Sequence, residues 1–349
     1  ASAWGATSMS STSTSSRTST TAPIRSTPAE ALPGLARPRA HPPIESLLGA
    51  VGNTPLVRLR RIGAGLPGIR IYAKAEFMNP GGSVKDRAAL RMIQVALADG
   101  TFAPGRTLID STSGNTGIAY AWICSALGLR CTLVMPGNVS LPRKQAARAY
   151  GAEVIYSDPL EGSDGAIRKV RELVAAEPER WFYPDQYGNP ENPRAHELGT
   201  AVEIAEALDG RVAAFVAGMG TSGTVMGTTR GLRHLVPGVR CHGVEPAEPL
   251  HGLEGLKHMA TSIVPAIYDP AQLDSVISVP TAEGWAMAER LGAEEGLFVG
   301  HSAGAAVAGA LVVAGQMADR GEAGNVVTVL PDRADRYFDP ASWERKGGR

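Results

Sequence analysis

The sequence predicts an α/β fold with mainly parallel, twisted sheets flanked by helices. From Ile44 onward, apolar strand-like runs alternate with amphipathic or alanine-rich runs, as in successive β–α–β crossovers. Most strand-like runs are continuously apolar, as expected of strands covered on both faces. Glycine-rich turns stand where strand-like runs meet helical ones. The length of 349 residues suggests two domains or one large α/β unit.

The individual elements follow from apolar periodicity, with short continuous runs taken as strands and longer amphipathic runs as helices. In chain order, the predicted strands are 69–73, 107–110, 132–135, 153–156, 213–217, 240–244, 296–299 and 326–330. The predicted helices are 84–98, 117–127, 141–150, 163–175, 200–208, 224–235, 282–291 and 303–317.

The stretch 296–318 is a candidate membrane-spanning segment, because it carries no charged residue. Several glycines and the polar side chains of His301, Ser302 and Gln316 interrupt it. We therefore interpret it as a short strand, a glycine turn and a buried alanine-rich helix, and expect no membrane partner.

The beginning of the chain is rich in Ser, Thr and Pro and poor in apolar side chains. Such a segment cannot bury enough apolar surface to offset the entropy lost on ordering. We expect a disordered tail over residues 1–44, and it contains no apolar core of the kind that marks a signal peptide.

Charge and cysteine content narrow the classes of function. Lys plus Arg number 34 and Asp plus Glu number 34, so nothing favours a nucleic-acid or anionic-membrane partner. The three cysteines, Cys124, Cys131 and Cys241, are too few for a disulfide framework and indicate a reducing, cytoplasmic setting. No Cys/His group has zinc spacing, so no metal is expected.

The first glycine-rich turn, NPGGSVKDR at 79–87, places Lys85 in the first turn of a predicted helix, with Ser83 positioned to cap it. The helix dipole makes that end positive, which disfavours a cation and should lower the pKa of Lys85. A lysine with a lowered pKa suits a nucleophilic amine. The plainer interpretation is an exposed lysine that pairs with Asp86 or solvent.

The second turn, STSGNTG at 111–117, follows a predicted strand and opens a helix. Free backbone N–H groups and hydroxyls at a helix N-terminus form an anion pocket, which would fit a substrate carboxylate. An ordinary capped turn is the alternative. A last turn, GHSAGA at 300–305, has the same setting, with Ser302 as the expected N-cap beside His301.

The third turn, GMGTSGT at 218–224, should hold a phosphate for the same reason. It also matches G-x-G-x-x-G, and Glu245 follows near the spacing of a dinucleotide fingerprint. A nicotinamide-dependent dehydrogenase is therefore an alternative from a different class. The hydroxyls of Thr221, Ser222 and Thr224 favour a terminal phosphate monoester instead.

In their order and identity, these turns resemble the pyridoxal-phosphate β-family (fold type II), particularly the cysteine synthases, with the B type most similar. GNTPL at 52–56, RAYGA at 148–152 and DQYGNP at 185–190 carry the same resemblance, which runs from about residue 44 to about 338. The sequence departs from the family at Ala303, where a second serine is usual, and at His301, where Ile or Val is common.

The resemblance implies that Lys85 holds pyridoxal 5'-phosphate as a Schiff base and is the catalytic base. It implies that Asn115 contacts the ring hydroxyl and that Ser302 faces the pyridine nitrogen. The implied phosphate-binding residues are Gly220, Thr221, Ser222, Gly223 and Thr224. The implied substrate-binding residues are Thr112, Ser113, Gly114, Asn115, Thr116 and Gln186.

The implied activity is that of a transferase of cysteine biosynthesis. It replaces the activated oxygen of an O-activated L-serine by sulfide or another sulfur donor, through an aminoacrylate, to give L-cysteine. O-acetylserine is one donor, and O-phosphoserine is the other if Lys257 meets an acidic leaving group. A cystathionine β-synthase-like enzyme, another β-replacement enzyme and a non-catalytic homologue that senses a ligand are alternatives.

The resemblance also implies a tryptophan synthase β-like architecture of two domains, each with a mainly parallel sheet. A smaller, mobile domain that closes on the substrate would span 89–190. A larger cofactor-binding domain would use 45–88 and 191–345. A homodimer is the expected assembly, with a sulfur-carrier protein as a possible further partner.

Overall fold

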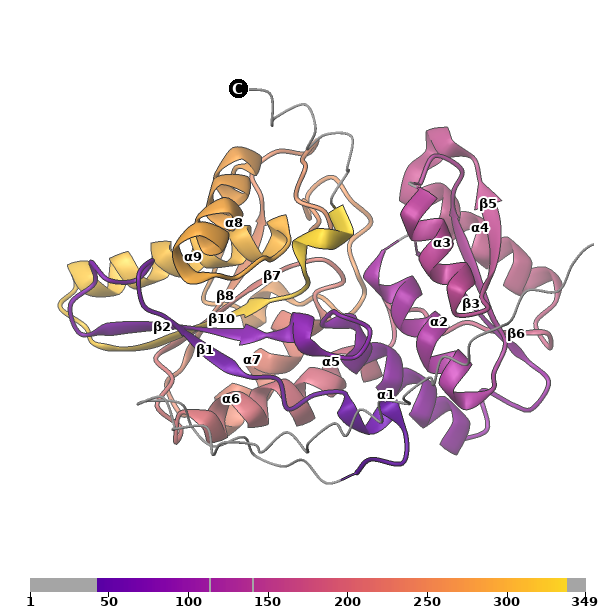
Figure 1. Cartoon of the computed structure of the whole chain (residues 1–349), viewed down its shortest axis with the longest axis horizontal. Coiled ribbons are helices and arrows are strands. Elements are labelled where there is room, and N and C mark those ends of the chain that lie inside the picture. Colours follow the sequence, from indigo (N-terminus) through magenta and orange to yellow (C-terminus); the bar gives the residue numbers. More distant parts are fainter. Residues whose placement is uncertain (1–42, 113, 140, 338–349) are drawn as a thin grey trace, which may run out of the picture. The chain divides into compact units, whose positions relative to one another are not determined.

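The computed structural model describes residues 43–112, 114–139 and 141–337 (Figure 1). The tail predicted over 1–44 lies outside the described residues except for Pro43 and Ile44. The contacts divide the chain after Pro43, and every described strand and helix belongs to the unit that begins at Ile44.

The strands of this unit form two sheets that are mainly parallel, as predicted. The larger sheet has the order β1-β2-β10-β7-β8-β9 and the smaller has β5-β4-β3-β6. Only β1 is antiparallel to its neighbour in the described sheets. The strands are β1 (Leu56–Leu59), β2 (Ile69–Ala75), β3 (Thr107–Ser111), β4 (Cys131–Pro136), β5 (Glu153–Ser157), β6 (Trp181–Phe182), β7 (Ala214–Gly218), β8 (Arg240–Pro246), β9 (Ser275–Val279) and β10 (Gly324–Leu330).

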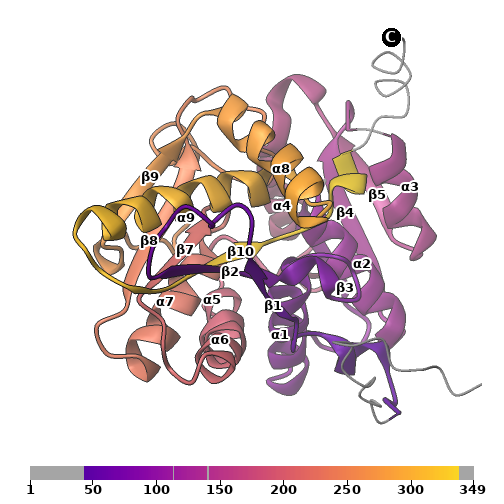
Figure 2. The same cartoon turned by 60° about the vertical axis from the view of Figure 1, so that its left-hand side comes forward.

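Helices cover both faces of each sheet (Figure 2). On the larger sheet α9 lies on one face with α8 outside it, and α7 lies on the other face with α5 and α6. On the smaller sheet α4 covers one face, and α2 covers the other beside α1 and α3. The helices are α1 (Lys85–Ala98), α2 (Asn115–Leu127), α3 (Leu141–Ala149), α4 (Gly162–Ala176), α5 (Glu191–Ala195), α6 (Ala201–Ala207), α7 (Gly223–Leu235), α8 (Thr281–Glu295) and α9 (His301–Asp319).

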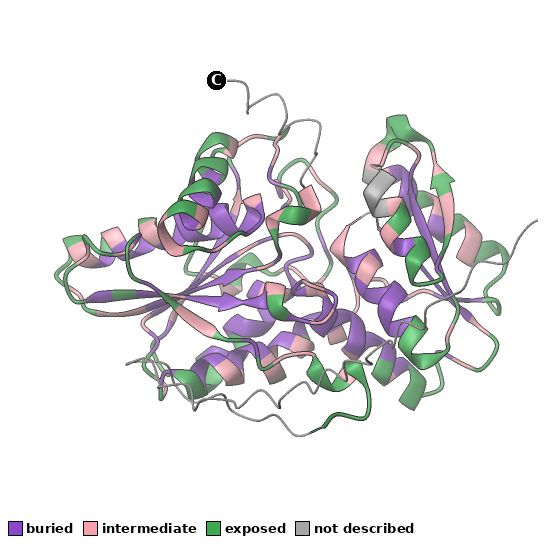
Figure 3. Ribbon diagram, viewed as in Figure 1, coloured by how far each residue is buried: buried purple, intermediate pink, exposed green. Residues whose placement is uncertain are grey.

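Strand β10 shows why the sequences of the central strands are continuously apolar. Val326 and Leu330 belong to the core on the α9 side, while Val327 and Val329 belong to the core on the α7 side. All four are buried, as are the middles of the neighbouring strands (Figure 3). A strand covered on both faces needs apolar residues at consecutive positions.

Several elements outside the central strands differ from the sequence-based prediction. The predicted strand 296–299 is wrong, because only Val299 makes an isolated bridge, to Arg333 beyond the end of β10. The edge strands β1 and β9 and the two-residue β6 were not predicted. β9 is largely exposed and β6 is very short, so neither carries a strong apolar signal. The predicted helix 200–208 is the end of a longer helical run that begins with α5.

The smaller sheet comes from residues 107–182, within the range 89–190 predicted for the smaller domain. The domain boundaries and the mobility themselves stay predictions. In the described part of the chain α9 is long and apolar enough to cross a membrane, but 67% of its apolar window is buried inside the protein. Helix α9 therefore packs as a core helix, in agreement with the sequence interpretation.

Close packing of α9 on α8 depends on a glycine. A Cβ at Gly304 would overlap the backbone oxygen of Gly284, whereas a Cβ at Gly315, on the same helix, would meet nothing within 4 Å. We expect Gly304→Ala to lower the free energy of unfolding by about 1–3 kcal/mol through overpacking. Gly315→Ala is the matched control and should be neutral or slightly stabilising, because alanine favours a helix. Denaturant unfolding of both variants is the measurement, and equal effects would contradict the explanation.

Candidate active site

The N-termini of α1, α2, α7 and α9 meet around one cavity, at the carboxyl ends of β7 and β10. Ligand sites of α/β proteins lie at this edge of the sheet. The lining of the cavity includes Lys85, Asn115, Gly220, Thr221, Ser222, Gly223, Thr224, Ser302 and Asp332. The structure thus brings together every residue predicted to contact the cofactor.

Lys85 is the first residue of α1 and lines the cavity. Burial lowers the pKa of its amine, and the carboxylate of Asp332 opposes that shift in part. The predicted direction is therefore confirmed, although burial is the main cause rather than the helix dipole. Asp86 does not serve as a partner for Lys85, because its carboxyl accepts hydrogen bonds from the Gly81 N–H and from Trp122 Nε1 at 3.1 Å.

The loop from Gly220 to Thr224 opens α7 and lies tightly against its neighbours. A Cβ at Gly220 would overlap the backbone oxygen of Gly255, and one at Gly223 would overlap the side chain of Asn192. Ser222 adopts a left-handed backbone with φ of 67°. The first N–H groups of a helix have no intrahelical acceptor, so this loop can bind an anion as predicted.

The second predicted turn opens α2, where Asn115 lines the cavity. The hydroxyl of Thr112 accepts hydrogen bonds from the N–H groups of Gly114 and Gly117, at 3.3 and 3.2 Å. Thr116 donates a hydrogen bond to the buried amide of Gln186 at 2.8 Å. Ser113 lies outside the described residues. Four further predicted substrate residues that the structure describes are not among those that line this cavity: Thr112, Gly114, Thr116 and Gln186. Their role stays a prediction.

Ser302 lines the cavity and is buried, but it is not the N-cap of α9. Gly300 is the cap, because its backbone is extended and α9 begins at His301. The prediction of a capping role for Ser302 is therefore wrong, and its hydroxyl is left for the cavity. His301 stacks between Trp285 and Tyr337, with ring centroids 4.8 and 6.1 Å away.

Two further residues singled out from the sequence are engaged elsewhere. Lys257 is not among the residues that line the cavity: its Nζ lies 5.2 Å from the ring centroid of Tyr187, and burial lowers its pKa. Glu245, the acidic residue of the dinucleotide fingerprint, accepts a hydrogen bond from the Met259 N–H at 3.1 Å. Its carboxylate is thus occupied by the backbone rather than presented to a ribose.

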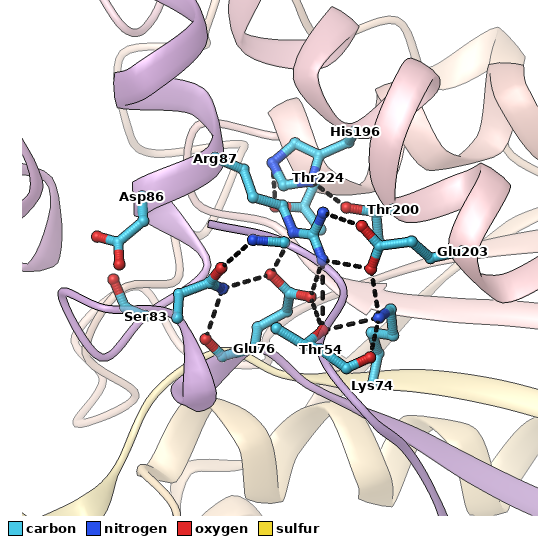
Figure 4. Close-up of polar contacts among 12 residues, drawn as sticks. Thr54, Lys74, Glu76, Ser83, Asp86, Arg87, His196, Thr200, Glu203 and Thr224 are labelled. Atoms are coloured by element: carbon cyan, nitrogen blue, oxygen red, sulfur yellow. Dashed lines mark hydrogen bonds and ion pairs between the residues drawn. The ribbon is translucent and has the colours of Figure 1, made fainter. Parts of the chain in front are cut away.

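A buried ion cluster lies beside the first turn of α1 (Figure 4). We call it the Arg87 cluster, and its members are Thr54, Lys74, Glu76, Arg87 and Glu203. Arg87 donates to both oxygens of Glu76 at 2.6 and 2.8 Å and to both oxygens of Glu203 at 2.6 and 2.7 Å. Lys74 completes it with a 2.6 Å bond to Glu203.

The charges of the Arg87 cluster stabilise one another. Burial alone would raise the pKa of Glu76, but Arg87 outweighs it and lowers that pKa. The same balance lowers the pKa of Glu203 to about 2. Both carboxyls are therefore ionised at neutral pH. Thr54, from the GNTPL segment, donates to Glu76 at 2.6 Å, which gives that segment a structural role.

His196 is a residue of the site that the sequence analysis missed. It lies in a π-helical turn, η4 (His196–Thr200), and is 1% exposed. Its Nδ1 is 2.9 Å from the Thr200 hydroxyl and its Nε2 is 3.3 Å from the hydroxyl of Thr224 in the α7 loop. Burial, reinforced by Arg87, lowers the pKa of His196 to about 3, so the ring is neutral. Nothing in the local sequence marks it, because Thr224 approaches only in the folded chain.

Asp332 and Arg336 were missed as well, and both contact Asn115. A signal for Asp332 was present, since it follows the apolar run of β10 and polar residues at the carboxyl end of a buried strand often belong to a site.

Comparison with known proteins identifies the class. Residues 47–332 match the family described as "Pyridoxal-phosphate dependent enzyme". The chain belongs to this family and is a pyridoxal-phosphate-dependent enzyme of fold type II. This assignment leaves the alternative of a nicotinamide-dependent dehydrogenase without support.

The individual relatives are similar over nearly their whole length. A cysteine synthase of Aquifex aeolicus is 47% identical over 304 residues, which cover 86% of this chain and 93% of the relative. The crystal structure of cysteine synthase (OASS) from Entamoeba histolytica superposes with a TM-score of 0.83 at 34% identity, covering 89% of this chain and 93% of that one. An O-acetylserine dependent cystathionine beta-synthase from Helicobacter pylori has a TM-score of 0.78 at 36% identity, covering 85% and 98%.

The residues of the cavity fit the cofactor of this family. Lys85 offers an amine whose lowered pKa favours its reactive, uncharged form. The α7 loop offers a helix N-terminus with hydroxyls for a phosphate, and its glycines allow close backbone approach. Asn115 and Ser302 supply neutral polar groups to the lining of the same cavity.

The neutral His196 predicts a pH dependence of stability. The unfolded chain takes up this proton near pH 6.5 and the folded chain only near pH 3, so stability falls as pH drops through that window. We expect the difference in free energy of unfolding between wild type and His196→Gln to shrink by about 3 kcal/mol from pH 7 to pH 4. Urea unfolding at each pH is the measurement. His234→Gln, at an exposed histidine, should run parallel to wild type, and a parallel profile for His196→Gln would contradict the neutral ring.

Proposed function

We propose that the protein is a cysteine synthase that makes L-cysteine from an O-activated L-serine and sulfide. The observation that carries the proposal is the single cavity formed by Lys85, Asn115, the α7 loop and Ser302. It occurs in a chain that is 47% identical to a cysteine synthase over 86% of its length. O-acetylserine is the proposed donor, in keeping with the names of the solved relatives.

Pyridoxal phosphate, when bound, withdraws electrons from the substrate and makes the proton on its α-carbon acidic. We assign to the Lys85 amine two tasks, holding the cofactor and then removing and returning that proton. Its lowered pKa favours the uncharged amine that the removal requires. Its fixed place at the start of α1 keeps it close to the α-carbon in both steps.

The other residues bind and orient. The α7 loop would hold the cofactor phosphate by backbone N–H groups and by the hydroxyls of Thr221, Ser222 and Thr224. The start of α2 would hold the substrate carboxylate, with Thr112 and Thr116 shaping the turn. The neutral Ser302 would meet the ring nitrogen without forcing its protonation, which favours replacement at the β-carbon over transamination.

The assembly and setting proposed for the protein are a homodimer in the cytoplasm. The three cysteines are free and buried, a state that agrees with a reducing compartment. Sulfide is the simplest sulfur donor, and a sulfur-carrier protein is the alternative donor. Sedimentation of the purified protein tests the dimer, and a particle of 36.4 kDa would contradict it.

Substitution of Lys85 tests the proposed chemistry. We expect Lys85→Ala to lower the kcat of cysteine formation at least 1,000-fold, because the proton transfer and the covalent anchor are both lost. It should also lose the visible absorption band that the cofactor gives in the wild-type enzyme. Lys169→Ala is the control, since Lys169 pairs with Glu172 on the exposed face of α4. Retention of turnover by Lys85→Ala would refute the assignment.

The choice of donor is tested by kinetics with O-acetylserine and O-phosphoserine. Because Lys257 lies beside Tyr187 and not in the cavity wall, we expect O-acetylserine to be preferred and Lys257→Ala to change kcat/KM by less than threefold for either donor. A loss of tenfold or more confined to O-phosphoserine would place Lys257 at the leaving group. Homocysteine in place of sulfide tests the cystathionine-forming alternative that the Helicobacter pylori relative suggests.

A further inference from the structure

The cavity contains a buried carboxyl with only one of its oxygens engaged. Asp332 follows β10, is 1% exposed and lines the cavity with Lys85 and Asn115. Its Oδ2 accepts hydrogen bonds from Asn115 Nδ2, at 2.6 Å, and from the Tyr337 hydroxyl. Its Oδ1 has no hydrogen-bond partner among the described residues. Burying a carboxyl oxygen without a hydrogen-bond partner costs free energy of folding. A functional role would explain why Asp332 lies at this position.

Asp332 and Arg336 hold the Asn115 amide from both ends. Asn115 Oδ1 accepts a hydrogen bond from the Arg336 guanidinium, while one hydrogen of Nδ2 goes to Asp332. A primary amide has one oxygen and two N–H groups. Because a guanidinium only donates and this carboxylate oxygen accepts, the amide cannot flip without losing both contacts. The amide nitrogen of Asn115 also lies within hydrogen-bonding reach of the Tyr337 hydroxyl, so a group in the cavity would share or replace that contact.

Arg336 is itself fixed from a second side. It also donates to the backbone oxygen of Gly81, in the turn that precedes Lys85. The next residue, Gly82, has φ of 77°, and a Cβ there would lie 2.5 Å from Arg336 Nη2. The turn η6 (Ala334–Tyr337) therefore contacts both the start of α2 and the approach to α1. The guanidinium has little freedom to release the Asn115 oxygen.

We propose that Asp332 and Arg336 are positioning residues that fix the Asn115 amide as a hydrogen-bond donor toward the ring oxygen of the cofactor. The proposal rests on the proposed function and on the contact between Asn115 and the ring hydroxyl that the resemblance to the cysteine synthases implies. A donor at this oxygen favours its deprotonated form, whereas a flipped amide would present an oxygen and favour the protonated form. The two residues thus set the charge state of the ring oxygen through Asn115.

The absorption spectrum of the holoenzyme reports the charge state of the ring oxygen, and no substrate is needed for the measurement. We expect Asp332→Ala to raise the ratio of the short-wavelength band to the visible band by about tenfold at pH 7, the effect of losing one hydrogen bond to a charged group. Asp332→Asn should stay within about twofold of wild type, because its carbonyl can replace Oδ2 and its amide can replace the unpartnered Oδ1. Asp335→Ala, on the same turn but exposed and paired with Arg333, is the matched control.

A double-mutant cycle separates the proposal from a direct action of the Asp332 charge on Lys85. In an Asn115→Ala background, Asp332→Ala should give no further change in the band ratio. A further change there, an Asp332→Asn spectrum equal to that of Asp332→Ala, or an unchanged Asp332→Ala spectrum would each overturn the proposal. Arg336→Met, which removes the other contact of the amide, should raise the ratio as well and serves if Asp332→Ala does not fold.

The outcome is distinguishable from a failure of the proposed function. The spectra require only bound pyridoxal phosphate, and neither O-acetylserine nor sulfide is added. An enzyme that makes no cysteine but shows the expected band ratios would refute the proposed reaction and leave the positioning role supported.

Discussion

The geometry of the site depends on the buried Arg87 cluster. Arg87 lies two residues after Lys85, and its guanidinium is bonded to Glu76 at the end of β2 and to Glu203 on α6. Removing one partner of a buried ion pair commonly costs about 3–5 kcal/mol, because a charge is left uncompensated. The cluster therefore fixes the first turn of α1 against the larger sheet. The backbone of Lys85 is thereby held beside the cavity that its side chain lines.

Convergence of helix N-termini explains the electrostatic character of the cavity. The starts of α2 and α7 offer positive partial charge to anions, which suits a carboxylate and a phosphate. The start of α1 carries a lysine in the same positive field, which agrees with an amine that works uncharged. Two buried groups act locally in this field: Asp332 opposes the lowering of the Lys85 pKa, and His196 is neutral.

The central strands and the glycine-rich turns could be predicted because each depends on its own residues. Burial on both faces requires consecutive apolar side chains, and tight turns at helix starts require glycine with hydroxyls. The capping role of Ser302 was predicted wrongly because the spacing alone does not show that α9 begins two residues earlier, after the extended Gly300. The edge strands β1 and β9 gave weak signals because most of their residues are exposed or half-buried.

The sequence by itself determined the fold class, the family and a set of residues that line one cavity, because these depend on local patterns in a fixed order. Only the tertiary structure decided how those residues are oriented. Asn115 is more than 200 positions away from both Asp332 and Arg336 along the chain, and Gly81 is equally distant from Arg336. Hydrogen bonds between such distant residues form only when β10 and the turn after it pack against α1 and α2. The periodicity of apolar residues in the sequence does not predict this packing.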